Sequence, residues 1–175
     1  GILVLEEWDH AISRGAEILA EFLGSASTAD AHHITAPAPG GYGAVRCMEL
    51  AISDAGLTPA DIVQINAHGT STPLNDAAEA TAISTVFKDS TPFVTGTKGV
   101  TGHSLGAAGA IEAVAVILSM TNKTIPLTHG TKNIDPDFDR LNLVHLDSVS
   151  WEPGPTISNS FGFGGHNGSI VFGPA

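Results

Sequence analysis

The sequence predicts an α/β fold in which a mixed sheet is packed by helices on both faces. Between residues 43 and 121, short apolar runs of strand length alternate with segments of helical periodicity. This strand–helix–strand order implies right-handed crossovers and a mainly parallel sheet. After residue 122, short strand candidates stand among Pro, Asn, Asp and Gly residues, which indicates an antiparallel finish.

The first residues, Gly1–Glu7, form an apolar run that predicts a strand. Ala16–Ser27 predicts a second strand, paired with the first as a hairpin, and Trp8–Arg14 predicts a helical turn between them. Thr28–Gly41 is rich in Pro, Gly and His and is expected to be a loop. Because the chain starts inside an apolar run without an initiator Met, we expect it to be part of a longer protein.

A helix is predicted over Gly43–Ala55, where Val45, Met48 and Ile52 recur at helical spacing. Gly56 is the expected C-cap. The remaining predicted elements are, in order, a short helical turn at Thr58–Asp61, a strand at Ile62–Ala67, a helix capped by Asn75 and Asp76 that runs to Phe87, a strand at Phe93–Thr95, a helix at Ser104–Thr121, and strands at Ile125–Leu127, Leu143–Leu146, Thr156–Ser158 and Gly168–Phe172.

The composition fits one folded domain with a real core. The chain has 175 residues, of which 42% are hydrophobic and 14% charged. A net charge of −11 and the lack of any basic run argue against a nucleic-acid partner. The single cysteine, Cys47, favours a reducing compartment, so we expect the cytoplasm. The longest apolar run, Leu105–Met120, is too short and too interrupted for a membrane span.

Three polar segments follow predicted strands: Asn66–Asp76, Gly96–His103 and Ser158–Asn167. In open α/β sheets, sites lie at the carboxyl ends of parallel strands. We therefore expect His68 and His103 to meet beside a glycine-rich turn. Two converging histidines suit proton transfer or hydrogen bonding to a developing oxyanion.

Glu112 lies in an apolar helix at a position where the pattern favours a hydrophobic residue. A buried charge is costly unless it is paired, so we expect Lys98, His103 and Glu112 to form one site in which Lys98 orders His103. The hydroxyls of Thr70 and Thr72 either bend a loop or hold the amides of a ligand.

Other kinds of site are less well supported. The glycine-rich turn lacks the context of a nucleotide-binding loop. Zinc is disfavoured because His32 and His33 are adjacent and no cysteine cluster accompanies them. A site for a monovalent or hard cation remains open, and its oxygen ligands would come from Asn66, Glu112 and Asn159.

A competing motif, Gly102-His-Ser-Leu-Gly106, matches the nucleophile elbow of serine hydrolases, with Ser104 as nucleophile. Such an elbow requires a buried strand that runs straight into the serine, whereas the polar, glycine-broken segment Thr95–Thr101 intervenes here. The hydrolase is therefore the third hypothesis. Acids and bases in the required order would be Asp137 or Asp139 and His145 or His166.

From Gly1 to Phe172 the chain resembles the carboxyl-terminal half of a β-ketoacyl-acyl-carrier-protein synthase of the type II system, a synthase II-like condensing enzyme. The motifs that carry this resemblance are His68-Gly-Thr-Ser-Thr-Pro73, Thr97-Lys-Gly-Val-Thr-Gly-His103, Gly106-Ala-Ala-Gly-Ala-Ile-Glu112 and Asn159-Ser-Phe-Gly-Phe-Gly-Gly165.

The resemblance implies a thiolase-like fold, in which residues 1–27 belong to the end of the amino-terminal half and residues 28–175 form the carboxyl-terminal domain. It also implies an acyltransferase of fatty-acid biosynthesis. Such an enzyme decarboxylates malonyl-acyl-carrier-protein, and the carbanion attacks an acyl thioester held on a cysteine. The implied partners are acyl carrier protein, the amino-terminal half and, in the full-length enzyme, a second subunit. No cofactor is required, because the substrate brings its own phosphopantetheine.

The resemblance also assigns roles to residues. His68 and His103 assist decarboxylation, and Lys98 with Glu112 orients the pair. The family positions that contact the phosphopantetheine arm correspond to Thr70 and Thr72. The gating phenylalanine of the family corresponds to Phe163, with support from Phe161. The positions around a structural monovalent cation correspond to Asn66, Glu112 and Asn159.

The nucleophilic cysteine of the family lies in the amino-terminal half, which this chain lacks. Cys47 cannot replace it, because it lies inside a predicted helix and resembles a buried small hydrophobe. The chain alone is therefore expected to be inactive and to expose an apolar patch around the helix Ser104–Thr121. The alternative is a polyketide ketosynthase or a non-catalytic partner like a chain-length factor. The presence of His68, Lys98 and His103 argues against the non-catalytic case.

Overall fold

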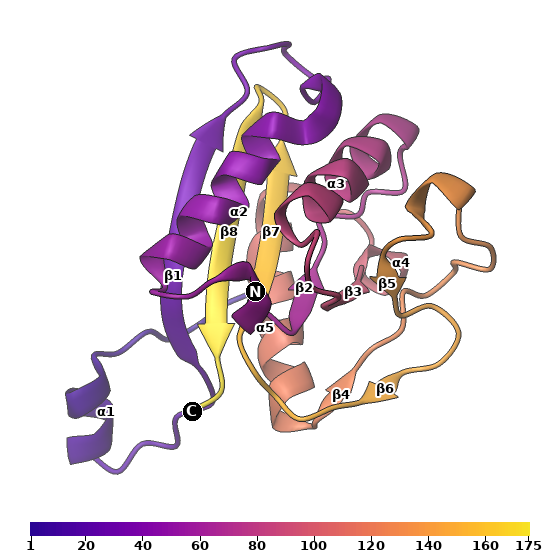
Figure 1. Ribbon diagram of the computed structural model, residues 1–175. Coiled ribbons are helices and arrows are strands. Elements are labelled where there is room, and N and C mark those ends of the chain that lie inside the picture. Colours follow the sequence, from indigo (N-terminus) through magenta and orange to yellow (C-terminus); the bar gives the residue numbers. More distant parts are fainter.

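A computed structural model describes all 175 residues, and a six-stranded sheet runs through it in the order β1-β8-β7-β2-β3-β5 (Figure 1). The strands are β1 (Glu21–Ala29), β2 (Gln64–Asn66), β3 (Phe93–Thr95), β5 (Asn142–Leu143), β7 (Thr156–Gly162) and β8 (His166–Gly173). From β7 to β5 the neighbours are parallel, whereas β8 is antiparallel to both β7 and β1. The predicted mixed sheet is confirmed. A separate antiparallel pair joins β4 (Thr124–Ile125) to β6 (Val149–Ser150).

Helices cover both faces of this sheet, as predicted. The helices are α1 (Trp8–Ser13), α2 (Tyr42–Asp54), α3 (Pro73–Val86), α4 (Lys98–Thr101) and α5 (Ala108–Thr121). In Figure 1, α2 and α3 lie in front of the sheet and α5 lies behind it. Each side has its own hydrophobic core, one around Met48 and Ile65 and the other around Val116 and Trp151. None of the helices combines the length and apolar character needed to cross a membrane.

The helix predicted over Gly43–Ala55 is confirmed as α2, which buries Cys47, Met48 and Ile52. Gly56 follows it with φ +70°, a left-handed conformation that glycine adopts without strain. The predicted turn after it is also present, and Asp61 closes it by accepting hydrogen bonds from the Thr58 amide at 2.8 Å and hydroxyl at 2.6 Å.

The predicted amino-terminal hairpin is wrong. Residues 1–7 form no strand, and Ile2 and Val4 are 91% and 85% exposed. The strand that follows starts at Glu21 and not at Ala16, and it pairs with β8 along its length. Pairing with a distant strand thus replaces the local hairpin, with one irregularity in the β1–β8 register between Phe22 and Gly24. The domain boundary predicted at residue 28 falls inside β1.

Two predicted helix starts are also wrong. The third helix begins at Pro73 and not at Asn75, because proline fits the first helical position and Thr72 precedes it in an extended conformation. The helix predicted from Ser104 begins at Ala108. A short 3₁₀ turn at Leu105–Ala107 lies between Ser104 and the start of the helix, and Leu105 has a positive φ of 53°.

Candidate active site

His68 follows β2 on a loop that is held by a carboxylate which the sequence analysis did not identify. Glu79, on α3, accepts hydrogen bonds from the His68 amide at 2.8 Å and from the Gly69 amide at 2.9 Å. Oε1 of Glu79 also lies 3.4 Å from Nδ2 of Asn159, on β7. Glu79 is fully buried, and burial raises the pKa of its carboxyl while these donors lower it. Glu79 therefore fixes the backbone that presents His68.

Lys98 and Glu112 form the predicted buried ion pair, since the Lys98 ammonium contacts Oε1 of Glu112. Glu112 is 1% exposed. Burial raises the pKa of the Glu112 carboxyl, and the ammonium opposes this effect. The same ammonium also donates to the carbonyl oxygen of His68 and lies 3.4 Å from its Nδ1.

The prediction that Lys98 orders His103 is therefore wrong, because the contacts of Lys98 are to His68. The sheet explains the difference. β2 and β3 are parallel neighbours, and the Ala67 amide donates to the Thr95 carbonyl at 2.9 Å, so the chain segments that leave the two strands lie side by side. Lys98 lies in the segment that follows β3, and it is therefore next to the loop that follows β2.

His68 and His103 do come together as predicted. Their ring centroids are 5.6 Å apart, and the rings are nearly perpendicular at 87°. His68 is buried, whereas His103 is exposed. His103 accepts a hydrogen bond at Nδ1 from the Leu105 amide at 3.1 Å, and His68 faces the Lys98 ammonium with Nδ1. In the neutral rings the proton is then on Nε2, so both histidines offer an N–H donor.

His68 stays neutral over the physiological range. Its pKa is lowered from 6.5 to about 3, first because burial disfavours the imidazolium and then because of the charges of Lys98 and His103. A neutral ring donates a hydrogen bond from Nε2 without bringing a positive charge of its own.

This shift predicts a pH-dependent stability. Below about pH 6.5 the unfolded chain binds a proton at His68 that the folded chain refuses, so stability should fall as the pH drops, with a slope approaching about 1.4 kcal/mol per pH unit. Replacing His68 with Gln should remove this contribution to the slope, whereas the opposite contribution of the Glu79 and Glu112 carboxyls, whose pKa values are raised, is present in both proteins. The measurement is urea unfolding at about pH 7, 6 and 5, with the exposed His32→Gln as control. An equal slope in the wild type and His68→Gln would contradict the prediction.

The two phenylalanines of the glycine-rich segment Ser158–Asn167 have different surroundings. Phe161 packs on His68, with ring centroids 5.8 Å apart, whereas Phe163 is 77% exposed at the turn. On the neighbouring loop, the Thr70 and Thr72 hydroxyls hydrogen-bond each other at 2.8 Å. Phe161 thus lies near the end of β7 and Phe163 in the turn after it, whereas Thr70 and Thr72 lie on the loop that leaves the adjacent strand β2.

Asp30 is a second buried carboxylate that the sequence analysis did not identify. It accepts hydrogen bonds from Nδ2 of Asn167 at 2.7 Å and from the Ala38 amide at 2.9 Å, and its own amide donates to the Gly165 carbonyl at 2.8 Å. Gly43 allows this arrangement, because a Cβ there would come within 1.9 Å of Oδ1 of Asp30. Asp30 therefore ties the segment before α2 to the glycine-rich turn. Its position between a strand and a loop carried no signal in the sequence.

The three residues considered for a cation are all buried, but they are not equivalent. Oδ1 of Asn66 and Oε2 of Glu112 are buried without a hydrogen-bond partner. Asn159, in contrast, accepts from the Ser169 hydroxyl at 2.8 Å. Nowhere do three or more His, Cys, Asp or Glu side chains gather as they would around a metal ion.

The serine-hydrolase hypothesis fails on the structure around Ser104. The helix α4 and Gly102 separate β3 from this serine, so no strand runs into it. Its buried hydroxyl has no hydrogen-bond partner, and hence no histidine base.

The Ser104→Ala variant should therefore be as stable as the wild type or slightly more stable, within about 0.5 kcal/mol, because it removes an unsatisfied hydroxyl. Thermal unfolding checks this, together with hydrolysis of a p-nitrophenyl ester before and after the change. A loss of esterase activity in Ser104→Ala would contradict it.

Residues 19–132, which include the histidine loops and the lysine, match the family described as "Beta-ketoacyl synthase, C-terminal domain". The chain belongs to this family. It is 48% identical, over 98% of its length, to the mitochondrial 3-oxoacyl-[acyl-carrier-protein] synthase of Arabidopsis thaliana, of which it covers 38%. It is 46% identical, over 98% of its length, to 3-oxoacyl-[acyl-carrier-protein] synthase 2 of Synechocystis, of which it covers 42%.

Solved structures of the family have the same fold as this chain. A β-ketoacyl synthase from Burkholderia phymatum superposes with a TM-score of 0.92 at 35% identity, over 97% of this chain and 41% of that one. The ketosynthase AntDE, solved with its acyl-carrier protein AntF, gives a TM-score of 0.93 at 35% identity, over 97% and 42% of the two chains. The thiolase-like fold and the synthase II-like carboxyl-terminal half are thus confirmed. The chain spans about two fifths of the length of these relatives.

Proposed function

We propose that this chain is the two-histidine part of a 3-oxoacyl-[acyl-carrier-protein] synthase. The observation that carries the proposal is the pair of Nε2 donors, on His68 and His103, with ring centroids 5.6 Å apart at the carboxyl ends of parallel strands. Curated relatives that are 45–48% identical are synthases of this name.

The geometry suits decarboxylation of a malonyl thioester. When the bond to the carboxylate breaks, CO₂ leaves and the electron pair moves towards the thioester oxygen as an enolate. Two N–H donors aimed at that oxygen stabilise the developing charge. The enolate carbon then attacks an acyl thioester, a carbon–carbon bond forms, and the thiolate departs. Lys98 and Glu112 support this site by holding His68, and Phe161 packs against the same ring.

The acyl group needs a nucleophile that these 175 residues do not supply. Cys47 is the only cysteine, and it is buried in α2, where its thiol donates to the Ala26 carbonyl at 3.3 Å. Burial raises the pKa of this thiol, which disfavours the reactive thiolate. We therefore expect the chain alone to form no acyl-enzyme.

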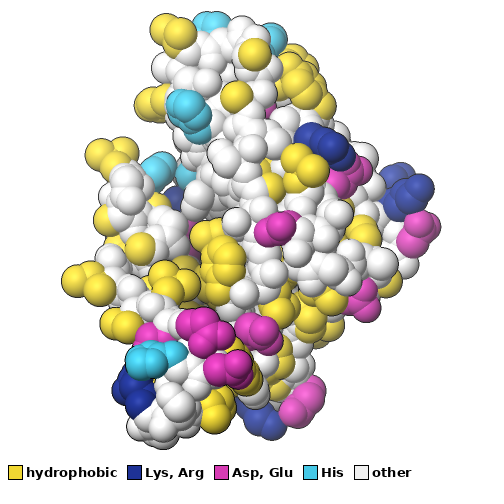
Figure 2. Space-filling model, turned by 90° about the vertical axis from the view of Figure 1, so that its left-hand side faces the viewer, with side chains coloured by type: hydrophobic (Ala, Val, Ile, Leu, Met, Phe, Trp, Pro, Cys, Tyr) yellow, Lys and Arg dark blue, Asp and Glu magenta, His cyan; other side chains and the backbone are white.

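The expected partners are an amino-terminal part that supplies the cysteine, a second subunit, and acyl carrier protein, whose phosphopantetheine arm would pass Thr70, Thr72 and Phe163. An apolar groove supports the first of these. It has a volume of about 460 Å³ and is lined by residues that include Leu3, Phe22 and Ile170. The β1 side of the molecule, with many apolar side chains at its surface, is shown in Figure 2.

A structural cation is a further part of the proposal. The unpartnered oxygens of Asn66 and Glu112 suit a monovalent or other hard cation. Asn159 would contribute less, because its side-chain oxygen already accepts from Ser169.

A polyketide ketosynthase is the alternative. The ishigamide ketosynthase/chain length factor superposes with a TM-score of 0.91 and covers 96% of this chain. It is 38% identical, less than the curated 3-oxoacyl-[acyl-carrier-protein] synthases. The two alternatives differ in whether the 3-oxo group is reduced before the next extension, so the products of repeated extension with and without a 3-oxoacyl reductase distinguish them.

A chimera tests the proposal. These 175 residues replace the matching segment of the Synechocystis synthase, so that the missing nucleophile is restored. We expect the chimera to condense malonyl- and acyl-carrier-protein and the isolated chain to form no product. His68→Ala and His103→Ala should each abolish decarboxylation, whereas the exposed His32→Ala should not. A folded chimera without decarboxylase activity, or condensation by the isolated chain, would contradict the proposal.

A further inference from the structure

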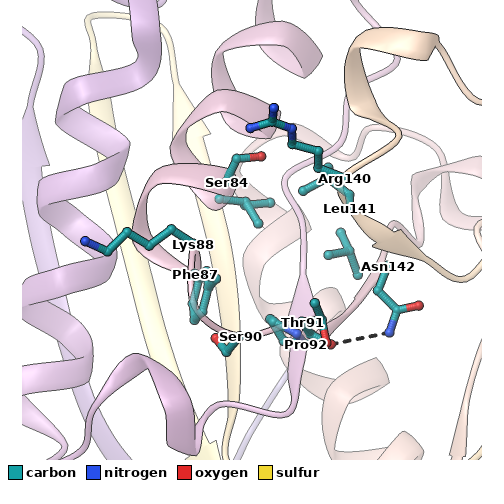
Figure 3. Close-up of a pocket in the computed structure, with 11 residues that line it drawn as sticks. Ser84, Phe87, Lys88, Ser90, Thr91, Pro92, Arg140, Leu141 and Asn142 are labelled. Atoms are coloured by element: carbon teal, nitrogen blue, oxygen red, sulfur yellow. Dashed lines mark hydrogen bonds between the residues drawn. The ribbon is translucent and has the colours of Figure 1, made fainter.

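A second pocket lies at the opposite end of the sheet from the histidines, where α3 ends and β3 and β5 begin (Figure 3). Its volume is about 150 Å³. The strand β3 starts beside this pocket and ends near Lys98, and α3 starts at Pro73 near the histidine loop and ends here. The pocket is therefore separate from the candidate active site, and the proposed condensation makes no use of it.

The pocket combines an apolar floor with a polar rim. The floor consists of Ile83, Phe87, Val94 and Leu141, of which the first three are almost completely buried. The rim carries basic and hydroxyl side chains, and no carboxylate lines the pocket. This is unusual in a chain with 18 acidic and only 7 basic residues. The rim residues are Ser84, Lys88, Ser90, Thr91, Arg140 and Asn142.

Several rim groups are not used by the protein. In Figure 3 the Arg140 guanidinium lies above Ser84 at one end of the pocket. No salt bridge or hydrogen bond to protein involves Arg140, although most basic residues in the chain are paired. The Ser84 hydroxyl is likewise free, whereas Thr81 and Thr85 on the same helix each donate to a helix carbonyl at 2.8 Å. A free guanidinium beside a free hydroxyl is a ready donor set for an anion.

We propose that this pocket binds a small organic carboxylate with an apolar body. The carboxylate accepts hydrogen bonds from Arg140 and Ser84, and the apolar part covers Phe87 and Leu141. The cavity corresponds to about five water volumes, which matches a body of roughly six to nine non-hydrogen atoms. An inorganic anion would leave the apolar floor of the pocket exposed to water, so it should bind more weakly than the carboxylate. A neutral apolar molecule would leave the guanidinium without a partner, so it should also bind more weakly.

Benzoate is the test ligand, added to the isotope-labelled 175-residue chain at constant ionic strength and followed by amide NMR shifts. We expect saturable shifts around Ser84 and Asn142, with a millimolar Kd. Benzyl alcohol and inorganic phosphate should each bind at least about tenfold more weakly. Because the readout is binding, it does not depend on condensation.

Two variants and a matched control complete the test. Arg140→Gln should weaken benzoate binding at least about tenfold, and Ser84→Ala should weaken it to a lesser degree. Arg46→Gln removes an exposed arginine from α2 and should change nothing. The proposal is overturned if benzyl alcohol or phosphate binds as well as benzoate, if the shifts lie elsewhere, or if Arg140→Gln binds benzoate like the wild type. Should Arg140→Gln unfold, unchanged binding by Ser84→Ala would be equally decisive against it.

Discussion

Replacing Lys98 with methionine should destabilise the protein by about 3–5 kcal/mol at neutral pH. The change keeps the length of the side chain but removes the ammonium that pairs with Glu112, a residue with only 1% of its surface exposed. A lone carboxylate at that position must either stay ionised without a partner or take up a proton. The first is costly because burial disfavours the charged form, which is also why burial raises the pKa of this carboxyl. The second is costly at neutral pH because the carboxyl is ionised there in the unfolded chain.

Two companion variants distinguish this explanation from loss of packing. Lys98→Met combined with Glu112→Leu removes both charges, so it should recover much of the loss. The deficit of Lys98→Met should also shrink between about pH 7 and pH 5, since Glu112 is then protonated more easily. Urea unfolding measures both effects. A loss below about 1 kcal/mol in Lys98→Met, the size expected of a surface pair, would contradict the prediction.

Replacing Glu79 with glutamine should have the second largest effect. Both oxygens of Glu79 accept backbone N–H bonds, from His68 and Gly69. An amide keeps one acceptor and turns its NH₂ group towards the other N–H, so one buried donor loses its partner. We expect a loss of about 1–3 kcal/mol in stability and a displacement of the His68 loop.

The displacement gives a readout that a loss of stability alone does not. In Glu79→Gln the ring of His68 should move from its place beside Lys98, and its pKa should rise from about 3 towards the ordinary value. NMR titration of the imidazole protons measures this rise. The control is Glu49→Gln, an exposed site on α2, which should change stability by less than about 0.5 kcal/mol. A Glu79→Gln variant with an unchanged His68 pKa would contradict the positioning role.

The middle of the fold could be predicted from the sequence because its signals are local. The strand Phe93–Thr95 is confirmed with the predicted bounds, and α2 differs by a single residue at each end. Periodicity, the glycine after the helix and the Thr58–Asp61 turn all depend on neighbours within a few residues. The amino-terminal hairpin failed because strand pairing is a long-range choice, in which β8 competes for the same strand.

For the site, the sequence by itself determined which loops meet. His68, Lys98 and His103 follow strands that were predicted to be parallel, and parallel strands bring their carboxyl ends to one edge. Only the tertiary structure decided which side chain touches which. It placed Lys98 against His68 and not His103, and it added Glu79 and Asp30, whose partners are backbone amides from other segments. Residue type and spacing set where a loop emerges, whereas a hydrogen bond depends on positions within a fraction of an ångström that the packing of all the elements fixes.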